Sequence, residues 1–235
     1  MKKILVFDSG YGGDVLADKI IRDFPDVQVF RTIDWRNAPF SAKTADEIRE
    51  ITEKAIAKYI GKVNVIVIGS YEATAAALQY LRYKYPEQVF VGAAWPDARE
   101  LKVKSRLARK RRLLVLTTGI VRRSREFSKR RRKWIGVAVA IKECDEWERL
   151  IDDGEMNGRK LRQDLGRFVA ACPEYVMLLS LNFLEVKKEI QMLFGPETKV
   201  LDGRLVLMRA IKAAIQRECV VKYENGRQKE FEGRV

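Results

Sequence analysis

The sequence predicts an α/β fold with mostly parallel sheets, divided into two halves. Short apolar runs alternate along the chain with amphipathic stretches, which is typical of consecutive strand–helix units. The 235 residues are 47% apolar, which is enough for two domains of roughly 110 residues, each with its own core. The stretch 93–108 is interpreted as the crossover between the two halves.

The alternation predicts eight strands and seven helices. The expected strands cover residues 3–7, 27–32, 63–68, 88–91, 113–117, 136–141, 175–179 and 199–201. The expected helices cover residues 14–23, 44–60, 72–85, 121–133, 157–170, 184–194 and 204–217. The helix at 44–60 has the clearest signal, because Thr44 can cap it and an apolar stripe follows. Near the C-terminus, Asn225-Gly226 predicts a type I′ hairpin.

The helix at 204–217 is expected to return to the first half of the chain. The predicted division is therefore 1–95 plus about 204–235 for the first α/β domain, and 96–203 for the second.

Composition excludes several classes of site. The chain has no histidine, so histidine triads, histidine bases and zinc sites that need imidazole are excluded, and no metal site is expected. Its three cysteines, Cys144, Cys172 and Cys219, are too few and too widely spaced for a disulfide framework, so a cytoplasmic location is expected. No apolar run approaches the ~18 residues of a membrane-spanning helix, so no membrane partner is expected.

The turn after the first strand, Asp8-Ser9-Gly10-Tyr11-Gly12-Gly13, is a candidate ligand-binding loop. Ligands of open α/β sheets bind at the carboxyl ends of the strands, where this turn lies. Its glycines would allow positive φ and close approach to a ligand, and the next helix would offer free N–H groups to an anion. Val15 stands where a dinucleotide site needs its third glycine, which excludes that class. A tight turn without a ligand role is the alternative.

Five segments of the chain resemble, in order, the motifs of the glutamate racemases within the aspartate/glutamate racemase superfamily. The first segment stands where that family carries its opening motif. The other four stand where it carries the motifs Pro-Tyr-Gly, Cys-Asn-Thr, Thr-x-Gly-Thr and Gly-Cys-Thr-His-Tyr. The segments are 6–13, 34–41, 65–75, 116–121 and 176–183. The resemblance covers roughly residues 3–217 and implies two pseudo-symmetric domains with an interdomain cleft. It also implies a cofactor-independent isomerase that uses two cysteines, one on each side of the substrate Cα, and often forms homodimers.

Serine occupies both positions where the family carries those cysteines, Ser70 and Ser180. A serine hydroxyl is a weaker acid than a thiol by several pKa units, so it does not ionise to a usable base near neutral pH, and no histidine is available to activate it. We therefore expect a divergent glutamate racemase-like protein without normal two-cysteine activity, a pseudoenzyme or a protein with altered binding of a small amino acid or carboxylate. An active racemase that uses unusual bases is the first alternative.

Other positions of the family's motifs also differ. Tyr71 and Glu72 follow the first serine, and Leu181 and Asn182 follow the second. Glu72 would add negative charge where an acidic substrate should bind. Cys144 is the one cysteine that could lie near the ligand edge, although an apolar packing role is the alternative. The candidate catalytic positions are Ser70, Ser180 and Asp8. The candidate ligand-binding residues are Ser9, Pro39, Phe40, Ser41, Thr74, Thr117, Gly119 and Asn182.

The net charge of +14 is concentrated in one segment. Residues 102–133 contain fifteen lysines and arginines and one acid, Glu126, and the rest of the chain has 31 basic and 31 acidic residues. Such a segment is either a solvated surface or a binding surface for nucleic acid or another polyanion, which is the second functional alternative. Attachment to a membrane surface is the least favoured reading, because no apolar face accompanies the charge. The candidate polyanion-binding residues are Arg109, Lys110, Arg111, Arg112, Arg122, Arg123, Lys129, Arg130, Arg131, Arg132 and Lys133.

Overall fold

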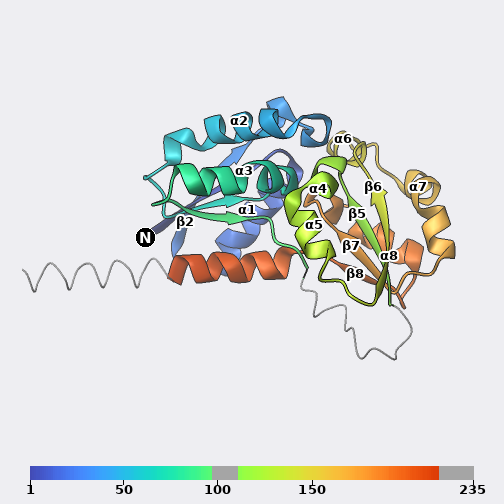
Figure 1. The fold of residues 1–235 in the computed structure, drawn as a ribbon. Helices are drawn as coiled ribbons and strands as arrows, with labels where there is room; N and C mark the ends of the chain where they lie inside the picture. Colours follow the sequence, from blue (N-terminus) through green and yellow to red (C-terminus); the bar gives the residue numbers. More distant parts are fainter. Residues whose placement is uncertain (97–110, 217–235) are drawn as a thin grey trace, which may run out of the picture.

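The computed structural model describes residues 1–96 and 111–216, which form two α/β lobes side by side (Figure 1). The predicted hairpin at Asn225-Gly226 and the residues Cys219, Arg109 and Lys110 lie outside this part of the chain. Each lobe contains one parallel sheet of four strands.

The first sheet has the strand order β2-β1-β3-β4, and every pair in it is parallel. Its strands are β1 (Lys2–Asp8), β2 (Val27–Ile33), β3 (Val65–Ile68) and β4 (Val89–Gly92). The helices of this lobe are α1 (Tyr11–Asp23), α2 (Ala45–Ile56) and α3 (Tyr71–Lys84), with short 3-10 turns at Trp35–Asn37, Phe40–Ala42 and Ala57–Tyr59. Thr44 and Glu47 form a capping box at the start of α2, as the sequence predicts.

The second sheet repeats this arrangement with the order β6-β5-β7-β8. Its strands are β5 (Arg111–Thr117), β6 (Val137–Glu143), β7 (Tyr175–Leu178) and β8 (Lys199–Leu201). Its helices are α4 (Gly119–Arg123), α5 (Arg125–Arg131), α6 (Trp147–Asp152), α7 (Gly158–Ala170) and α8 (Lys187–Phe194), with a 3-10 turn at Asn182–Leu184. The eight predicted strands all occur, and the predicted pair of α/β halves is the observed fold.

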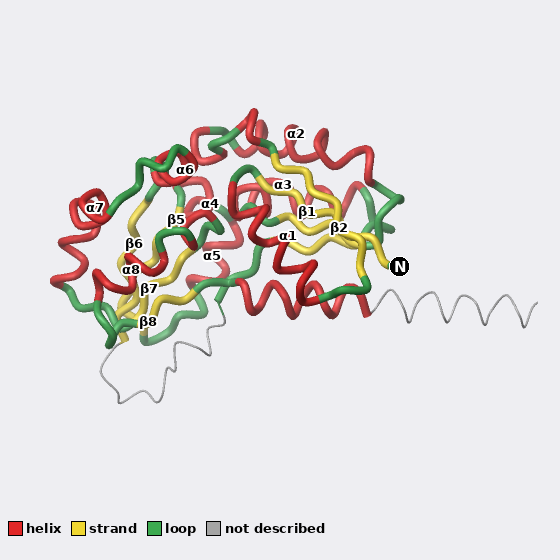
Figure 2. The backbone as a smooth tube through the Cα atoms, turned by 180° about the vertical axis from the view of Figure 1, so that it is seen from behind, coloured by secondary structure: helices red, strands yellow, loops and turns green. Residues whose placement is uncertain are grey.

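Helices cover both faces of each sheet, and the view from behind shows α1 over the strands of its lobe (Figure 2). In the first lobe, α1 packs on one face through Leu16 and Ile20, and α2 and α3 pack on the other. In the second lobe, α4 and α5 cover one face, and α6, α7 and α8 cover the other. Because both faces are buried, the central strands are almost continuously apolar, which is why they stood out in the sequence.

The last described helix, residues 204–216, packs on the first sheet. Its side chains Leu207, Met208 and Ile211 share a core with Ile4 and Val6 of β1. This packing supports the predicted return of the chain to the first lobe, and we keep the division of 1–95 plus about 204–235 against 96–203 as a proposal.

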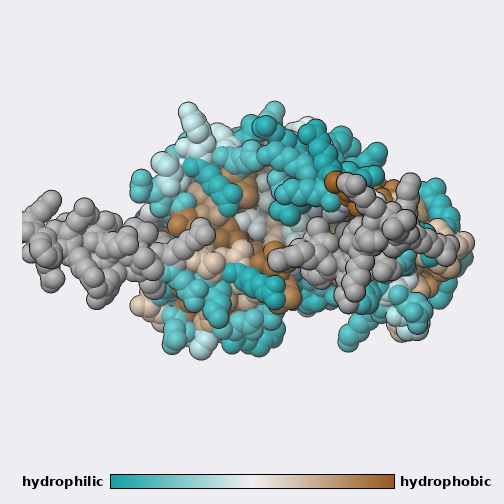
Figure 3. All heavy atoms as spheres, turned by 60° about the horizontal axis from the view of Figure 1, so that its bottom comes forward, coloured by the Kyte–Doolittle hydropathy of each residue, from teal (hydrophilic) through white to brown (hydrophobic). Residues whose placement is uncertain are grey.

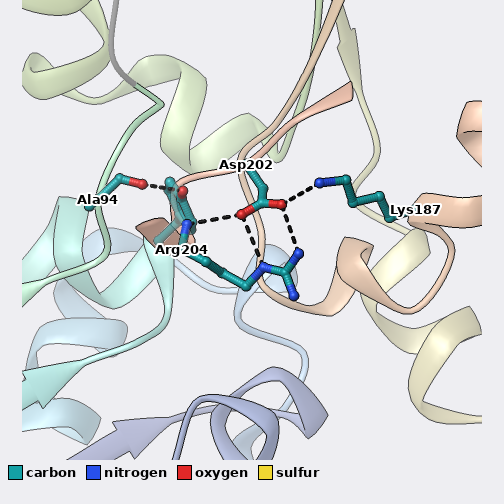
Figure 4. A network of polar contacts seen from close by, with 5 residues as sticks. Ala94, Lys187, Asp202 and Arg204 are labelled. Atoms are coloured by element: carbon teal, nitrogen blue, oxygen red, sulfur yellow. Dashed lines mark hydrogen bonds and ion pairs between the residues drawn. The ribbon is translucent and has the colours of Figure 1, made fainter. Parts of the chain in front are cut away.

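An ion-pair network holds the point where the chain leaves the second sheet (Figure 4). Asp202, directly after β8, accepts a bond from Lys187 Nζ at 2.6 Å and two from the guanidinium of Arg204 at 3.0 Å. These cations lower the pKa of Asp202 to about 2, against the effect of its burial. The start of the last helix is therefore tied to α8 of the second lobe.

One helix prediction was wrong in part, and one helix was missed. The segment 121–133 is not one helix: α4 ends at Arg123, and Ser124 begins α5 by accepting a bond from the Phe127 N–H. The short helix α6 was not predicted. Among the described helices, none is long and apolar enough to span a membrane.

Candidate functional site

Buried polar side chains meet where the carboxyl ends of the two sheets face each other. Asp8 ends β1, and Ser70 follows β3 by two residues. Thr118 follows β5, and Ser180 follows β7 by two residues. All four are at most 5% exposed, although they lie at strand ends, because the lobes cover one another there.

Asp8 occupies a tight position between two glycines. A Cβ on Gly13 would lie 2.3 Å from Asp8 Cβ, and a Cβ on Gly69 would lie 2.5 Å from Asp8 Oδ2. The Ser9 N–H donates to Asp8 Oδ1 at 2.6 Å, whereas Oδ2 is buried and has no hydrogen-bond partner among the described residues. Burial, together with the charge of Glu72, raises the pKa of Asp8 to about 8.

Ser70 and Thr118 both bond to the side chain of Glu72. Ser70 caps α3 by accepting a bond from the Ala73 N–H, and its hydroxyl donates to Glu72 Oε2 at 2.9 Å. The Thr118 hydroxyl, from the second lobe, donates to Glu72 Oε1 at 2.6 Å. Glu72 is 1% exposed, and burial raises its pKa against the effect of these hydrogen bonds. This carboxyl therefore joins the two lobes.

Ser180 has an equivalent partner in Glu148, which comes from α6. The Ser180 hydroxyl donates to Glu148 Oε1 at 3.2 Å, and the Ser41 N–H of the first lobe donates to Oε2 at 3.3 Å. The Ser41 hydroxyl also donates to the Asp145 carbonyl at 2.8 Å. Burial, followed by the charge of Glu72, raises the pKa of Glu148 well above its ordinary value. Each serine at a cysteine position thus donates to a buried glutamate.

The opening turn differs from the prediction in two respects. None of its three glycines has positive φ, so close contact with Asp8 and with Leu181 and Asn182, not backbone conformation, requires them. The N–H groups at the start of α1 are also not free. Gly12 N donates to Asn182 Oδ1 at 3.0 Å, and the Tyr11 N–H bonds to Asp152, whose pKa burial raises to about 6. The protein's own amide and carboxyl groups therefore occupy the predicted anion position.

The charge at this interface is one-sided. Asp8, Glu72 and Glu148 interact electrostatically with one another. Within residues 1–96 and 111–216, no lysine or arginine forms a hydrogen bond or ion pair with any of the three. Burial without cations raises the pKa of all three carboxyls, so this cluster can hold, donate and accept protons.

The remaining predicted residues have separate hydrogen-bond partners or are buried in the core. Gly119 N donates to Asp145 Oδ1 at 2.7 Å, and Thr117 is fully buried at the end of β5. Phe40 is also fully buried, with its ring 6.3 Å from that of Phe7, and the adjoining Pro39 follows a cis peptide bond. Thr74 instead bonds to the Ala93 N–H beside β4. Their ligand-binding roles remain predictions.

Sequence reasoning missed Glu148 and Thr118. Glu148 belongs to an acid-rich stretch on a helix of six residues, which gave no periodic signal. Cys144, the one cysteine considered for catalysis, is 2% exposed and packs in the apolar core of the second lobe, where burial raises the pKa of its thiol. Exposed Cys172 lies after α7.

The described part of the basic segment forms a charged surface on α4 and α5. Arg122 pairs with Glu143, and Arg130 pairs with Glu126 and lies over the Trp95 ring, 5.4 Å from its centroid. Four further predicted residues are exposed: Arg123, Lys129, Arg132 and Lys133. Arg112 and Arg131 are half-buried. The Arg111 side chain lies outside the described part of the structure, and polyanion binding stays a prediction.

Comparison with known proteins gives a consistent family. No protein-family model matches the chain. The glutamate racemase of Clostridium novyi is 25% identical over 205 residues, covering 85% of this chain and 78% of that protein. The glutamate racemase of Clostridium acetobutylicum is 27% identical over 215 residues, covering 84% and 78%. These relatives, at about 25% identity over most of the chain, support its place in the aspartate/glutamate racemase superfamily.

Solved structures agree with this racemase-like fold. The structure of Escherichia coli glutamate racemase in complex with L-glutamate and the activator UDP-MurNAc-Ala has a TM-score of 0.78 at 21% identity, covering 91% of this chain and 82% of that one. Glutamate racemase of Francisella tularensis in complex with D-glutamate has a TM-score of 0.75 at 16% identity, covering 92% and 82%. The fold is that of a glutamate racemase, and at these identities the likeness shows the fold and not the activity.

Proposed function

We propose that this chain is a glutamate racemase-like protein without two-thiol racemisation, and that it is a pseudoenzyme toward glutamate. The observation that carries the proposal is the pairing of Ser70 with Glu72 and of Ser180 with Glu148. Both hydroxyl protons are donated to buried carboxyls instead of pointing to an open substrate site.

Proton transfer by two bases needs one group that accepts the Cα proton and a second that supplies one. A thiol with a pKa near ~8.5 can do both near neutral pH. A serine hydroxyl is a far weaker acid, and its activation requires a strong neighbouring base. A carboxyl that holds its own proton, as burial favours for Glu72 and Glu148, supplies no such base.

The charges at the interface also oppose glutamate as a ligand. Glutamate carries two carboxylates, and it would have to approach Asp8, Glu72 and Glu148 without a cation bonded to any of them in the described part of the chain. Any of these carboxyls that is ionised repels a second carboxylate, and a protonated one offers glutamate no cation. We therefore expect glutamate to bind this protein weakly.

The second candidate is an active racemase or related isomerase that uses carboxyl groups as bases. One observation favours it: Asp8 has a buried, unpartnered Oδ2 and a pKa of about 8, close to working pH. In this mechanism the Cα proton would pass to Asp8, and a second protonated carboxyl would return a proton to the opposite face. The Asp8→Asn variant would then lose all activity.

Solvent exchange separates the two candidates. The protein is incubated in D2O with L- and D-glutamate and L- and D-aspartate, and the loss of the Cα–H signal is followed by NMR. We expect no exchange above a protein-free control. Exchange that is lost in Asp8→Asn would support the carboxyl mechanism and reject the pseudoenzyme. The Ser70→Cys/Ser180→Cys variant is the companion, and activity need not return in it while Tyr71, Glu72, Leu181 and Asn182 are in place.

Polyanion binding, a homodimer and a cytoplasmic location remain predictions for this protein. The exposed bases on α4 and α5 support the first, and RNA and DNA binding measured against salt concentration tests it. An association constant that does not fall with added salt, or that is unchanged after neutralisation of residues 129–133, would contradict the prediction of polyanion binding.

A further inference from the structure

We propose that a cavity of about 840 Å³, on the first lobe where it meets α5 of the second, binds a small organic anion with an apolar body, such as a medium-chain carboxylate. The cavity is lined by residues of α2, α3, β4 and α5 and of the helix 204–216. In Figure 1, α3 and this last helix belong to the first lobe, and α5 lies at the adjoining edge of the second. Neither Ser70 nor Ser180 lines it, so the site is separate from the carboxyl cluster.

The floor of the cavity is apolar. β4 is the outer strand of its sheet, and Val89 and Val91 of this strand line the cavity. Ala210, Ala213 and Ala214 of the last helix also line it, and Ala210 and Ala214 share an apolar cluster with these two valines. On this lobe, Figure 3 shows apolar side chains gathered between hydrophilic ones. The volume lies within the range of roughly 300–1,000 Å³ that is usual for pockets that bury small ligands.

Four arginines surround this floor: Arg49, Arg82, Arg125 and Arg130. Glu126 is the one acid among the lining residues, and it already pairs with Arg130 at 2.7 Å. The lining therefore carries a clear excess of positive charge. Guanidinium groups present several donors in a fixed plane, which suits carboxylate and phosphate oxygens.

Two of these arginines are free to bind an anion. Arg82 donates to the Phe90 carbonyl at 2.8 Å, which fixes its position at the edge of the sheet, yet it has no acidic partner among the described residues. Arg125 likewise has no acidic partner within the described ranges. Among the described residues, Asp46 is the one acid that pairs with Arg49, and its side chain is 86% exposed. Arg49 also donates to the Ala76 carbonyl at 3.4 Å and lies over the Tyr80 ring. An anion at this rim would meet unneutralised donors beside an apolar surface.

A second cavity shows that the charge of the first is specific. It has a volume of about 600 Å³ and is lined by Asp152, Asp153, Glu185 and Glu189, with no lysine or arginine among its lining residues. The two cavities therefore have opposite charge. An anion with an apolar body would select the arginine-lined one.

The test is calorimetric titration of the full chain at low salt with octanoate, octylammonium and acetate. We expect octanoate to saturate one site, and octylammonium and acetate to bind at least tenfold more weakly. Octylammonium has the same apolar body with the opposite charge, and acetate has the charge without the body. Equal affinity for octanoate and octylammonium would overturn the proposal.

Three variants locate the binding. Arg82→Gln/Arg125→Gln should weaken octanoate binding at least tenfold, and Ala213→Trp, which fills the exposed wall and keeps every charge, should abolish it. Arg159→Gln/Arg162→Gln removes two exposed arginines from α7 and should change the affinity less than about twofold. The proposal fails if Ala213→Trp binds octanoate normally. It fails equally if this face binds only oligonucleotides, or only a second copy of the chain, and not octanoate.

Discussion

The pKa of Asp8 leads to an unusual pH dependence of stability. An unfolded aspartate with a pKa of 3.8 releases its proton above about pH 4, whereas folded Asp8 keeps its proton up to about pH 8. Between these pH values, deprotonation of this aspartate stabilises the unfolded state and does not stabilise the folded state. The free energy of unfolding therefore falls by about 1.4 kcal/mol for each pH unit from this carboxyl alone.

The Asp8→Asn substitution removes this dependence. Asparagine keeps a carbonyl oxygen that can accept the Ser9 N–H, and it does not titrate. Between about pH 5 and pH 7, the stability of Asp8→Asn relative to the parent protein should rise by about 3 kcal/mol, which corresponds to two pH units. Any cost of burying the amide is the same at both pH values and cancels in this difference.

Urea unfolding followed by circular dichroism at the two pH values measures this difference. Asp26→Asn is the matched control, because Asp26 is an exposed aspartate in the turn before β2, and its stability should stay within about 0.5 kcal/mol of the parent. A difference below about 1 kcal/mol for Asp8→Asn between pH 5 and pH 7 would refute the assignment of a protonated Asp8.

Three further substitutions test the contacts between the lobes. Gly203→Ala should lower stability by about 3 kcal/mol in a urea titration, because its Cβ would lie 1.5 Å from the Ala94 carbonyl oxygen, and unchanged stability would contradict this close contact. Thr118→Val removes the bond to Glu72 and should cost about 1–2 kcal/mol, which a cost below the error of the titration would disprove. Asp202→Asn should lower the free energy of unfolding by about 2 kcal/mol near neutral pH. This deficit should shrink as the pH falls from 4 toward 2, where Asp202 itself becomes protonated. A deficit that is constant with pH would argue against the low pKa of Asp202.

The sequence was sufficient to predict the framework of the fold. Each central strand is buried on both faces, so its signal is a local apolar run that does not depend on distant residues. The capping box of α2 is local in the same way, since Thr44 and Glu47 are three residues apart. Such features can be recognised without knowing where the chain goes next.

The candidate site was only partly predictable, because its polar contacts join distant residues. The bond between Ser41 and Glu148 spans 107 positions, and that between Thr118 and Glu72 spans 46. Glu148 looks like a surface residue in its own segment, and only the packing of the first lobe against α6 buries it. The resemblance to a known family located Ser70 and Ser180, but it could not show that each donates to a glutamate.

The most direct test of the proposed loss of racemisation is Cα deuterium exchange of D-glutamate by the unmodified protein at about pH 8. The glutamate racemase of Clostridium acetobutylicum serves as the active comparison under the same conditions. We predict exchange in the comparison protein and none above the protein-free control with this chain. Exchange catalysed by the unmodified chain would contradict the proposal, and its dependence on Asp8 would then identify the base.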